Sequence, residues 1–360
     1  MSELAAIQKA YGSVIKAGYD GLEIFMMNVG NADCFLAIRH YPNGVTKTVL
    51  IDGGNKTNAT DIAARLTGLG VSHINHVVNT HPHIDHAAGL VQLLEDDAFT
   101  YDHLWMHKAW NHINVQGIED QLGANSAKWV LESFKSSLAT QIQLFNLSVK
   151  KGVIPIEPFA GTQIGPFTVV GPTAEFYLSC LQSFGDADKV KQWNQFLAEQ
   201  HKPHTLLESI SDQLAEDAAT LGDVTSPENE SSIVMATSIH EKTILFTGDA
   251  GCDAFASIGN GPYGIQLKNL DWMQAPHHGS RRNLWQNAVS HFNPRIVFIS
   301  AEGSRKHPSK KLVNSFKATG ARVFSSHYPQ KSKYIWLRHS AGTVPARDLC
   351  EATPLYDATE

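Results

Sequence analysis

The 360-residue sequence predicts an α/β fold in which two β-sheets pack face to face and helices cover both outer surfaces, an αββα four-layer sandwich. Two observations predict it. Consecutive strand-like segments open the chain and then alternate with helical segments, and the same order returns after residue 229. A long helical stretch separates these two halves. We therefore expect one domain over residues 1–360, with a helical, acidic insertion at 174–228.

Apolar and β-branched runs between Gly and Asn turns predict the strands of the first half. They are expected at 22–28, 34–39, 46–52, 71–79 and 102–107, with two short strands within 153–173. Helical periodicity predicts the helices of this half at 3–18, 60–69, 87–97 and 119–149. In the second half, strands are expected at 232–237, 243–247, 270–274, 295–300 and 321–324, and helices near 283–290 and 308–318.

The composition is that of an ordinary globular protein, with 42% hydrophobic and 18% charged residues. No apolar run approaches the length needed to cross a membrane, and the N-terminus lacks the pattern of a secretory signal. The four cysteines are scattered without metal-site spacing, which indicates free thiols. These features predict a cytoplasmic protein without a membrane partner.

Charge is distributed unevenly, although the net charge is only −6. The segment 277–340 contains twelve Lys or Arg residues and one acid, Glu302, whereas 203–240 contains seven acids and no Lys or Arg. A basic C-terminal lobe favours an anionic, phosphate-bearing substrate such as a nucleotide or nucleic acid. The alternative, that solvated surface charges happen to cluster in sequence, is equally compatible with the pattern.

Residues 80–86 read Thr-His-Pro-His-Ile-Asp-His and form the main chemical signal of the chain. His81, His83, Asp85 and His86 combine imidazole nitrogens with a carboxylate, the ligand set that suits zinc and similar divalent metals. The segment lies between the strand at 71–79 and the helix at 87–97, so these side chains are expected on a loop at the carboxyl end of a strand. Four ligands exceed the need of one catalytic metal with an open position, which indicates two metals that share a bridging water.

Two later segments supply matching groups. At 243–250 (TILFTGDA) an apolar strand runs into Asp249, which is placed to bridge two cations or to be a solvent-facing turn residue. At 271–283 (DWMQAPHHGSRRN) a second strand ends in His277 and His278, of which one is expected to bind metal and the other to orient it or contact substrate. Ser280 and the following N–H groups are expected to receive a phosphate oxygen at a helix start.

These motifs, together with Asp52-Gly-Gly before them, resemble the metallo-β-lactamase-fold hydrolases. Within that superfamily they look most like the hydrolase domain of ComEC-type DNA-uptake proteins and their stand-alone relatives. The segments 28–33 (NVGNAD), 229–234 (NESSIV) and 307–309 (HPS) resemble that branch, although Asn28 stands where the branch has Asp.

The resemblance implies a role for each matching residue. His81 and His83 would hold metal site 1, Asp85 and His86 would hold site 2, Asp249 would bridge, and His277 or His278 would complete site 2. Asp52 would orient a ligand histidine without touching metal, and Ser280, Arg281 and His307 would contact phosphate oxygens, so that Asp85, Asp249 and His307 form the catalytic set. Many superfamily members supply a further histidine to site 1; His103, His107, His112, His201 and His204 lie in the right interval but not in the usual sequence context.

The resulting prediction is a hydrolase with two divalent metals, zinc first and manganese second, that cleaves phosphodiesters as a phosphodiesterase or nuclease. One alternative keeps the fold and changes the bond, to an esterase, lactonase or phosphorylcholine-esterase-like activity on a small molecule. A second alternative is a non-catalytic module that binds metal for stability and acts through a protein partner. The sequence leaves the substrate, the native metal, the oligomeric state and the pathway open.

Overall fold

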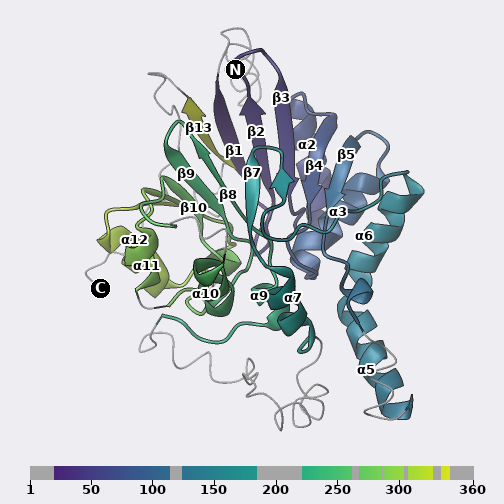
Figure 1. Cartoon of the computed structure of the whole chain (residues 1–360). Helices are drawn as coiled ribbons and strands as arrows, with labels where there is room; N and C mark the ends of the chain where they lie inside the picture. The colour runs from purple at the N-terminus through teal and green to yellow at the C-terminus, as the bar shows by residue number, and fades with distance from the viewer. Residues whose placement is uncertain are drawn as a thin grey trace.

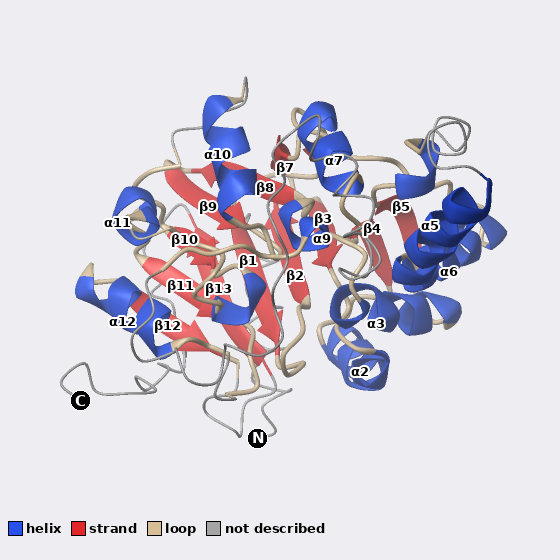
Figure 2. Ribbon diagram, turned by 90° about the horizontal axis from the view of Figure 1, so that it is seen from below, coloured by secondary structure: helices blue, strands red, loops and turns tan. Residues whose placement is uncertain are grey.

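The computed structural model describes residues 20–113, 124–184, 221–261, 267–285, 287–303, 307–326 and 334–340. Within these ranges the chain forms a mixed α/β sandwich of two sheets, with helices on the outer faces (Figures 1 and 2). This confirms the predicted fold class. The expected helix at 3–18 lies outside the described residues. No helix in the described ranges is long and apolar enough to span a membrane.

The first sheet has six strands in the order β13-β1-β2-β3-β4-β5. They are β1 (Gly21–Met27), β2 (Phe35–His40), β3 (Thr46–Ile51), β4 (His73–Val78), β5 (Thr100–Trp105) and β13 (Tyr334–Ser340). The β1-β2-β3 meander and the β13–β1 pair are antiparallel, whereas β3, β4 and β5 run parallel. Strand β13 was not predicted; it pairs with β1, the first strand of the same sheet.

The second sheet has seven strands in the order β12-β11-β10-β9-β8-β7-β6. They are β6 (Gln163–Ile164), β7 (Phe167–Gly171), β8 (Val234–Ile239), β9 (Lys242–Phe246), β10 (Trp272–Gln274), β11 (Ile296–Ile299) and β12 (Arg322–Ser325). Strands β9 to β12 are parallel, so their carboxyl ends meet at one edge. That edge faces the carboxyl ends of β3 and β4, and the loops between the two sheets carry the predicted site.

Three apolar layers hold the sandwich together. The central layer joins both sheets through residues such as Phe35 of β2 and Phe246 of β9, whose rings meet edge to face at 5.6 Å. One outer layer packs the first sheet against α2 (Ala59–Gly68), α3 (Ile84–Glu95) and α6 (Ala139–Lys150). The other packs the second sheet against α10 (Cys252–Asn260), α11 (Ala288–Phe292) and α12 (Lys310–Ala318).

Several expected helices have different bounds. The helix expected at 119–149 is two helices, α5 (Ala124–Ser137) and α6, separated at Leu138. The helix expected near 283–290 is limited to α11, and α10 was not predicted. Of the expected insertion, α7 (Ala174–Leu181) and the short α9 (Pro227–Glu230) are helical, whereas residues 185–220 lie outside the described residues. The extent of the insertion therefore stays a prediction.

Helix α3 begins at Ile84, three residues earlier than expected, so Asp85 and His86 lie in its first turn rather than on a loop. His83 is the extended residue just before the helix, as the preceding Pro82 favours. The carboxylate of Asp85 in the first turn complements the positive end of the helix dipole. The earlier start fixes the backbone of Asp85 and His86 relative to each other.

Candidate metal centre

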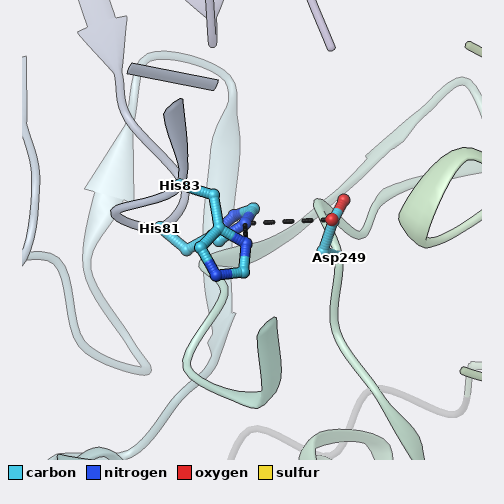
Figure 3. Close-up of side chains that lie close together, drawn as sticks. All are labelled: His81, His83 and Asp249. Atoms are coloured by element: carbon cyan, nitrogen blue, oxygen red, sulfur yellow. Dashed lines mark hydrogen bonds and ion pairs between the residues drawn. The ribbon is translucent and has the colours of Figure 1, made fainter. Parts of the chain in front are cut away.

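The structure brings together side chains from the two sheets that are more than 160 positions apart in sequence. Three groups of potential ligand atoms each lie within 4.8 Å of one another. These groups are His81/His83/Asp249, Asp85/His86/His278 and Asp33/His86/Asp249. Figure 3 shows His81 and His83, from the segment before α3, facing Asp249, which follows β9. Asp249 thus lies between the two sets that the sequence predicts.

Distances within the first group suit a single cation. His81 Nε2 lies 3.1 Å from His83 Nδ1 and 3.8 Å from Asp249 Oδ2. His81 and Asp249 are almost completely buried, whereas His83 is partly exposed. Access from solvent is therefore on the His83 side.

The second group also contacts Asp249, through His86 and His278. His278 Nε2 lies 3.2 Å from Asp85 Oδ2, and His86 Nε2 lies 3.4 Å from Asp249 Oδ1. His86 Nε2 and Asp249 Oδ1 are buried and have no hydrogen-bond partner. Buried polar atoms are rarely left unpaired, so two such atoms aimed at one another indicate a place for a cation.

The hydrogen bonds behind the imidazoles fix which nitrogen points into the site. His86 Nδ1 lies 2.8 Å from Asp52 Oδ2, and His278 Nδ1 lies 3.0 Å from the Ser300 carbonyl. In both rings Nδ1 donates to this outer partner, so Nε2 is the nitrogen that points toward the other side chains of the site.

His81 is oriented through Thr80. The Thr80 hydroxyl donates to Asp52 Oδ2 at 2.6 Å, which leaves its oxygen to accept from His81 Nδ1 at 3.1 Å. The Thr80 backbone N–H also donates to Asp52 Oδ1, at 2.8 Å. Asp52 therefore contacts His86 directly and His81 through Thr80.

Burial and opposite charges shift the pKa values of this cluster. Burial by itself would lower the pKa of His86, but the carboxylates of Asp249, Asp52 and Asp85 outweigh it and raise that pKa well above its usual value. Burial by itself would also lower the pKa of His278, but Asp249, Asp33 and Asp85 outweigh it and raise that pKa to about 10. Burial, helped by His86, lowers the pKa of His81 well below its usual value. A cation that binds His86 and His278 would displace their protons.

The carboxylate of Asp249 is strongly held in its charged form. Burial by itself would raise its pKa, but His86, His277 and His278 outweigh burial and lower the pKa well below the usual value. Asp249 also anchors the turn, because the side-chain amide of Asn283 donates to its carbonyl at 2.8 Å.

His277 and His278 have different positions. His278 is buried beside Asp85, whereas the side chain of His277 is 20% exposed, with Nε2 3.8 Å from Asp249 Oδ2. The rings of His277 and His307 lie 5.2 Å apart. Both His277 and His278 have left-handed backbone angles, with φ of 49° and 54°, which lets consecutive residues direct their rings to different sides.

The expected phosphate contacts are only partly placed. Ser280 follows a single 3-10 turn, His277–Gly279, and not the start of a helix, and its buried hydroxyl accepts from the Arg282 backbone N–H at 3.2 Å. The expectation of a helix N-terminus at Ser280 is therefore wrong. Arg281 is partly exposed.

The further histidine of site 1 is not found among the described residues. His103 stacks on His76 in the first sheet, His107 contacts the Pro158 carbonyl at 3.0 Å, and His112 pairs with Glu157 at 2.8 Å. His201 and His204 lie outside the described ranges. Of the basic lobe, Arg305, Lys306, Lys331 and Lys333 also lie outside them.

Two buried residues of the site were not assigned from the sequence. Asp33 is 1% exposed and lies within reach of His86 and Asp249, and Gln274 donates to it at 2.7 Å. The opening motif at 28–33 pointed to this region without indicating a role for Asp33.

The chain is similar in part to known proteins. Among solved structures, the chain is similar to a long form RNase Z from yeast, with a TM-score of 0.34 and 11% identity over 79% of this chain and 37% of that chain. It is also similar to a putative metallo-beta-lactamase from Thermotoga maritima, with a TM-score of 0.27 and 15% identity over 68% of this chain and 87% of that one. The chain thus spans well under half the length of the yeast RNase Z. No curated protein matches it in sequence. Residues 28–114, which carry His81, His83, Asp85 and His86, match the model of the metallo-beta-lactamase superfamily.

Proposed function

We propose that the protein is a metal-dependent hydrolase of phosphodiester bonds with a dinuclear centre. The observation that carries the proposal is the position of Asp249 between the two groups: its Oδ2 lies 3.8 Å from His81 Nε2 and 4.0 Å from His278 Nε2, and its Oδ1 lies 3.4 Å from His86 Nε2. His86 Nε2 and Asp249 Oδ1 are buried without a hydrogen-bond partner. His81, His83 and Asp249 would hold one cation, and Asp85, His86, His278 and Asp249 the other. The mixture of imidazole and carboxylate fits Zn²⁺ first and Mn²⁺ second.

Two cations bound here would lower the pKa of a water between them and stabilise negative charge on the reacting phosphoryl oxygens. The protein's own groups supply orientation. Asp52 and Thr80 hold the rings of His81 and His86 with Nε2 toward Asp249, so the ligands would need little rearrangement on loading. Burial of Asp249 and His81 keeps bulk water from the inner side of the site.

Substrate would approach from the side on which His83, His277 and His307 lie. His277 is partly exposed, so its ring can contact a phosphate oxygen that does not react, and the buried ring of His307 lies beside it. Arg281, partly exposed on the same loop, would add a charge-assisted contact. The preference for a phosphodiester also rests on the basic composition of 277–340 and on the motifs that resemble ComEC-type hydrolase domains, which favour a nucleotide or nucleic-acid substrate.

The test is a panel of substrates measured after removal and controlled return of metal. Bis-p-nitrophenyl phosphate, single-stranded DNA and RNA represent the proposal, and p-nitrophenyl acetate and a lactone represent carboxylic esters. We expect hydrolysis of the phosphodiesters with Zn²⁺ or Mn²⁺, and its loss in Asp249→Ala and His81→Ala. Asp97→Ala is the matched control, because the Asp97 side chain is 99% exposed. Phosphodiester hydrolysis that survives Asp249→Ala, or cleavage of carboxylic esters alone, would contradict the proposal.

A further inference from the structure

The buried carboxylate of Asp33 lies at the junction of the two sheets and is not among the ligands proposed above. It belongs to the loop between β1 and β2, and its backbone N–H donates to the Asp85 carbonyl at 3.3 Å. One carboxylate oxygen, Oδ1, lies 3.6 Å from His278 Nδ1, and the other, Oδ2, accepts a 2.7 Å hydrogen bond from Gln274 Nε2. A buried carboxylate with these neighbours contacts two segments of the site at once.

Gln274 is the last residue of β10 and is 1% exposed. Its side-chain oxygen accepts from two backbone N–H groups, Thr247 at 3.0 Å and Gly248 at 3.2 Å. Because both partners are donors, the oxygen of the amide must face them, and the NH₂ group must face Asp33. The direction of every hydrogen bond from Gly248 to Asp33 is therefore fixed.

Through Gly248, the hydrogen bonds of Gln274 act on the turn that carries Asp249. Gly248 immediately precedes Asp249 and has a left-handed φ of 50°. A Cβ at that position would lie 3.1 Å from Thr80, so the turn is already packed closely against the segment that carries His81. Gln274 thus holds the turn that presents Asp249, while Asp33 lies against His278 and Asp85.

The nitrogen of His278 that Asp33 approaches is Nδ1, which is not the nitrogen facing Asp85. Nδ1 already donates to the Ser300 carbonyl, so the nearby negative charge of Asp33 reinforces that orientation. This relation resembles the one between Asp52 and His86 on the opposite side of the site. Both imidazoles then have a buried carboxylate near Nδ1, whereas Nε2 faces Asp85 or Asp249.

We propose that Asp33 and Gln274 are a positioning pair that sets the distance between Asp249 and His278, and that neither residue binds metal itself. The inference rests on the proposed two-metal centre. It predicts that cutting the connection leaves two metal-binding sites per chain but weakens the second and changes its geometry. Outer partners of metal ligands commonly contribute 10- to 100-fold in metal affinity.

The experiment titrates metal-free protein with Co²⁺ and Mn²⁺, and measures stoichiometry, both affinities, the Co²⁺ visible spectrum and the Mn²⁺ EPR signal. Gln274→Leu removes the amide at similar volume. We expect two metals per chain, a second dissociation constant raised at least tenfold, and a weaker magnetic coupling between the ions. Thr237→Val is the matched control, since it removes a part-buried hydrogen bond to the Pro166 carbonyl in the same sheet, and it should leave both affinities unchanged.

Two further variants test the connection between Asp33 and Gln274 independently. Gln274→Glu retains an acceptor for Gly248 and places a carboxylate against Asp33, so it should weaken the second site even if Gln274→Leu does not fold. Asp33→Ala combined with Gln274→Leu should cost no more affinity than either change alone, because both cut the same connection. Additive losses would overturn the inference, as would unchanged affinities and spectra in Gln274→Leu and Gln274→Glu.

The stoichiometry separates the remaining outcomes. If Asp33 were itself a ligand, Asp33→Ala would bind one metal per chain while Gln274→Leu still bound two, and the positioning role would be refuted. If the unmodified protein bound no metal, the proposed function would fail first.

Discussion

The contact between Gly53 and Gly89 offers the sharpest test of how the sequence builds this site. Gly53 follows Asp52 at the end of β3, and Gly89 lies one turn beyond His86 on α3. The Gly53 N–H donates to the His86 carbonyl, and the Gly89 N–H donates to the Gly54 carbonyl, both at 2.9 Å. The backbones therefore touch at the position where Asp52 meets His86.

The Gly89→Ala change would place a Cβ 1.8 Å from the Gly53 carbonyl oxygen and 2.7 Å from its carbon. Ordinary contact needs about 3.5 Å, so α3 and the Asp52 loop must separate by roughly 1.7 Å. Overpacking of this kind costs about 1–3 kcal/mol, and stretching the 2.8 Å bond between His86 and Asp52 adds about 1.5–3 kcal/mol because a charged group is involved. The expected loss of unfolding free energy is about 2.5–6 kcal/mol.

Urea unfolding of the metal-free protein measures this loss directly, and metal titration measures its effect on the site. We expect the affinity of the site that contains His86 to fall at least tenfold. Gly259→Ala is the matched control, because Gly259 lies on α10 with no atom within 4 Å of the added Cβ, so the change should stabilise the protein by about 0.5 kcal/mol. Equal unfolding midpoints for Gly89→Ala and the unmodified protein would refute the reasoning.

Three other predictions concern charge, metal and pH. Asp52→Asn should weaken metal binding 10- to 100-fold while exposed Asp102→Asn does not, as isothermal titration would show; equal affinities would contradict the role of Asp52. Removal of metal with a chelator should lower the unfolding temperature, and Zn²⁺ at about 100 times its dissociation constant should restore about 2.7 kcal/mol, an effect that Asp249→Ala should abolish. Burial lowers the pKa of His107 from 6.5 to about 4. Its folded pKa lies below the unfolded one, so stability present above pH 6.5 is lost as pH falls toward 4, by about 3 kcal/mol in total. His107→Gln should remove that part of the pH dependence in urea unfolding between pH 7.5 and 4.5, and an unchanged dependence would contradict it.

Local patterns predicted the strands and ligand segments because each depends on neighbouring residues. The motif at 80–86 follows an apolar strand and precedes a helix, and Asp249 follows another strand, so both were placed at sheet edges without knowledge of the partner. Parallel strands then bring their carboxyl ends together. The sequence could not choose between His277 and His278, because the left-handed turn that separates their rings is a matter of backbone angles.

The missed features depend on contacts between distant segments. Helix α10 begins after Gly251 because the carboxylate of Glu230 accepts from the Ala254 N–H at 2.7 Å, and a Cβ on Gly251 would lie 2.0 Å from that carboxylate. The helix start is therefore capped from 24 positions away. Asp33 and Gln274 are separated by 241 positions, and neither has a local pattern that identifies its partner. The close approach of Gly53 and Gly89 likewise looks like an ordinary turn when only the sequence is read.

The left-handed run at 277–279 affects how any measured metal affinity should be understood. His277, His278 and Gly279 have φ of 49°, 54° and 79° in succession, and only the last is a residue that adopts such angles freely. Each non-glycine residue in this region costs of order 1–3 kcal/mol. The hydrogen bonds of His277 to Asn283 and of His278 to Ser300 hold the run in place. A short peptide with the sequence of this loop would lack those bonds and would bind metal far more weakly. The metal affinity of the folded protein therefore depends on two things. One is the intrinsic strength of the donor atoms, and the other is the folding free energy that already holds the strained loop in its binding conformation.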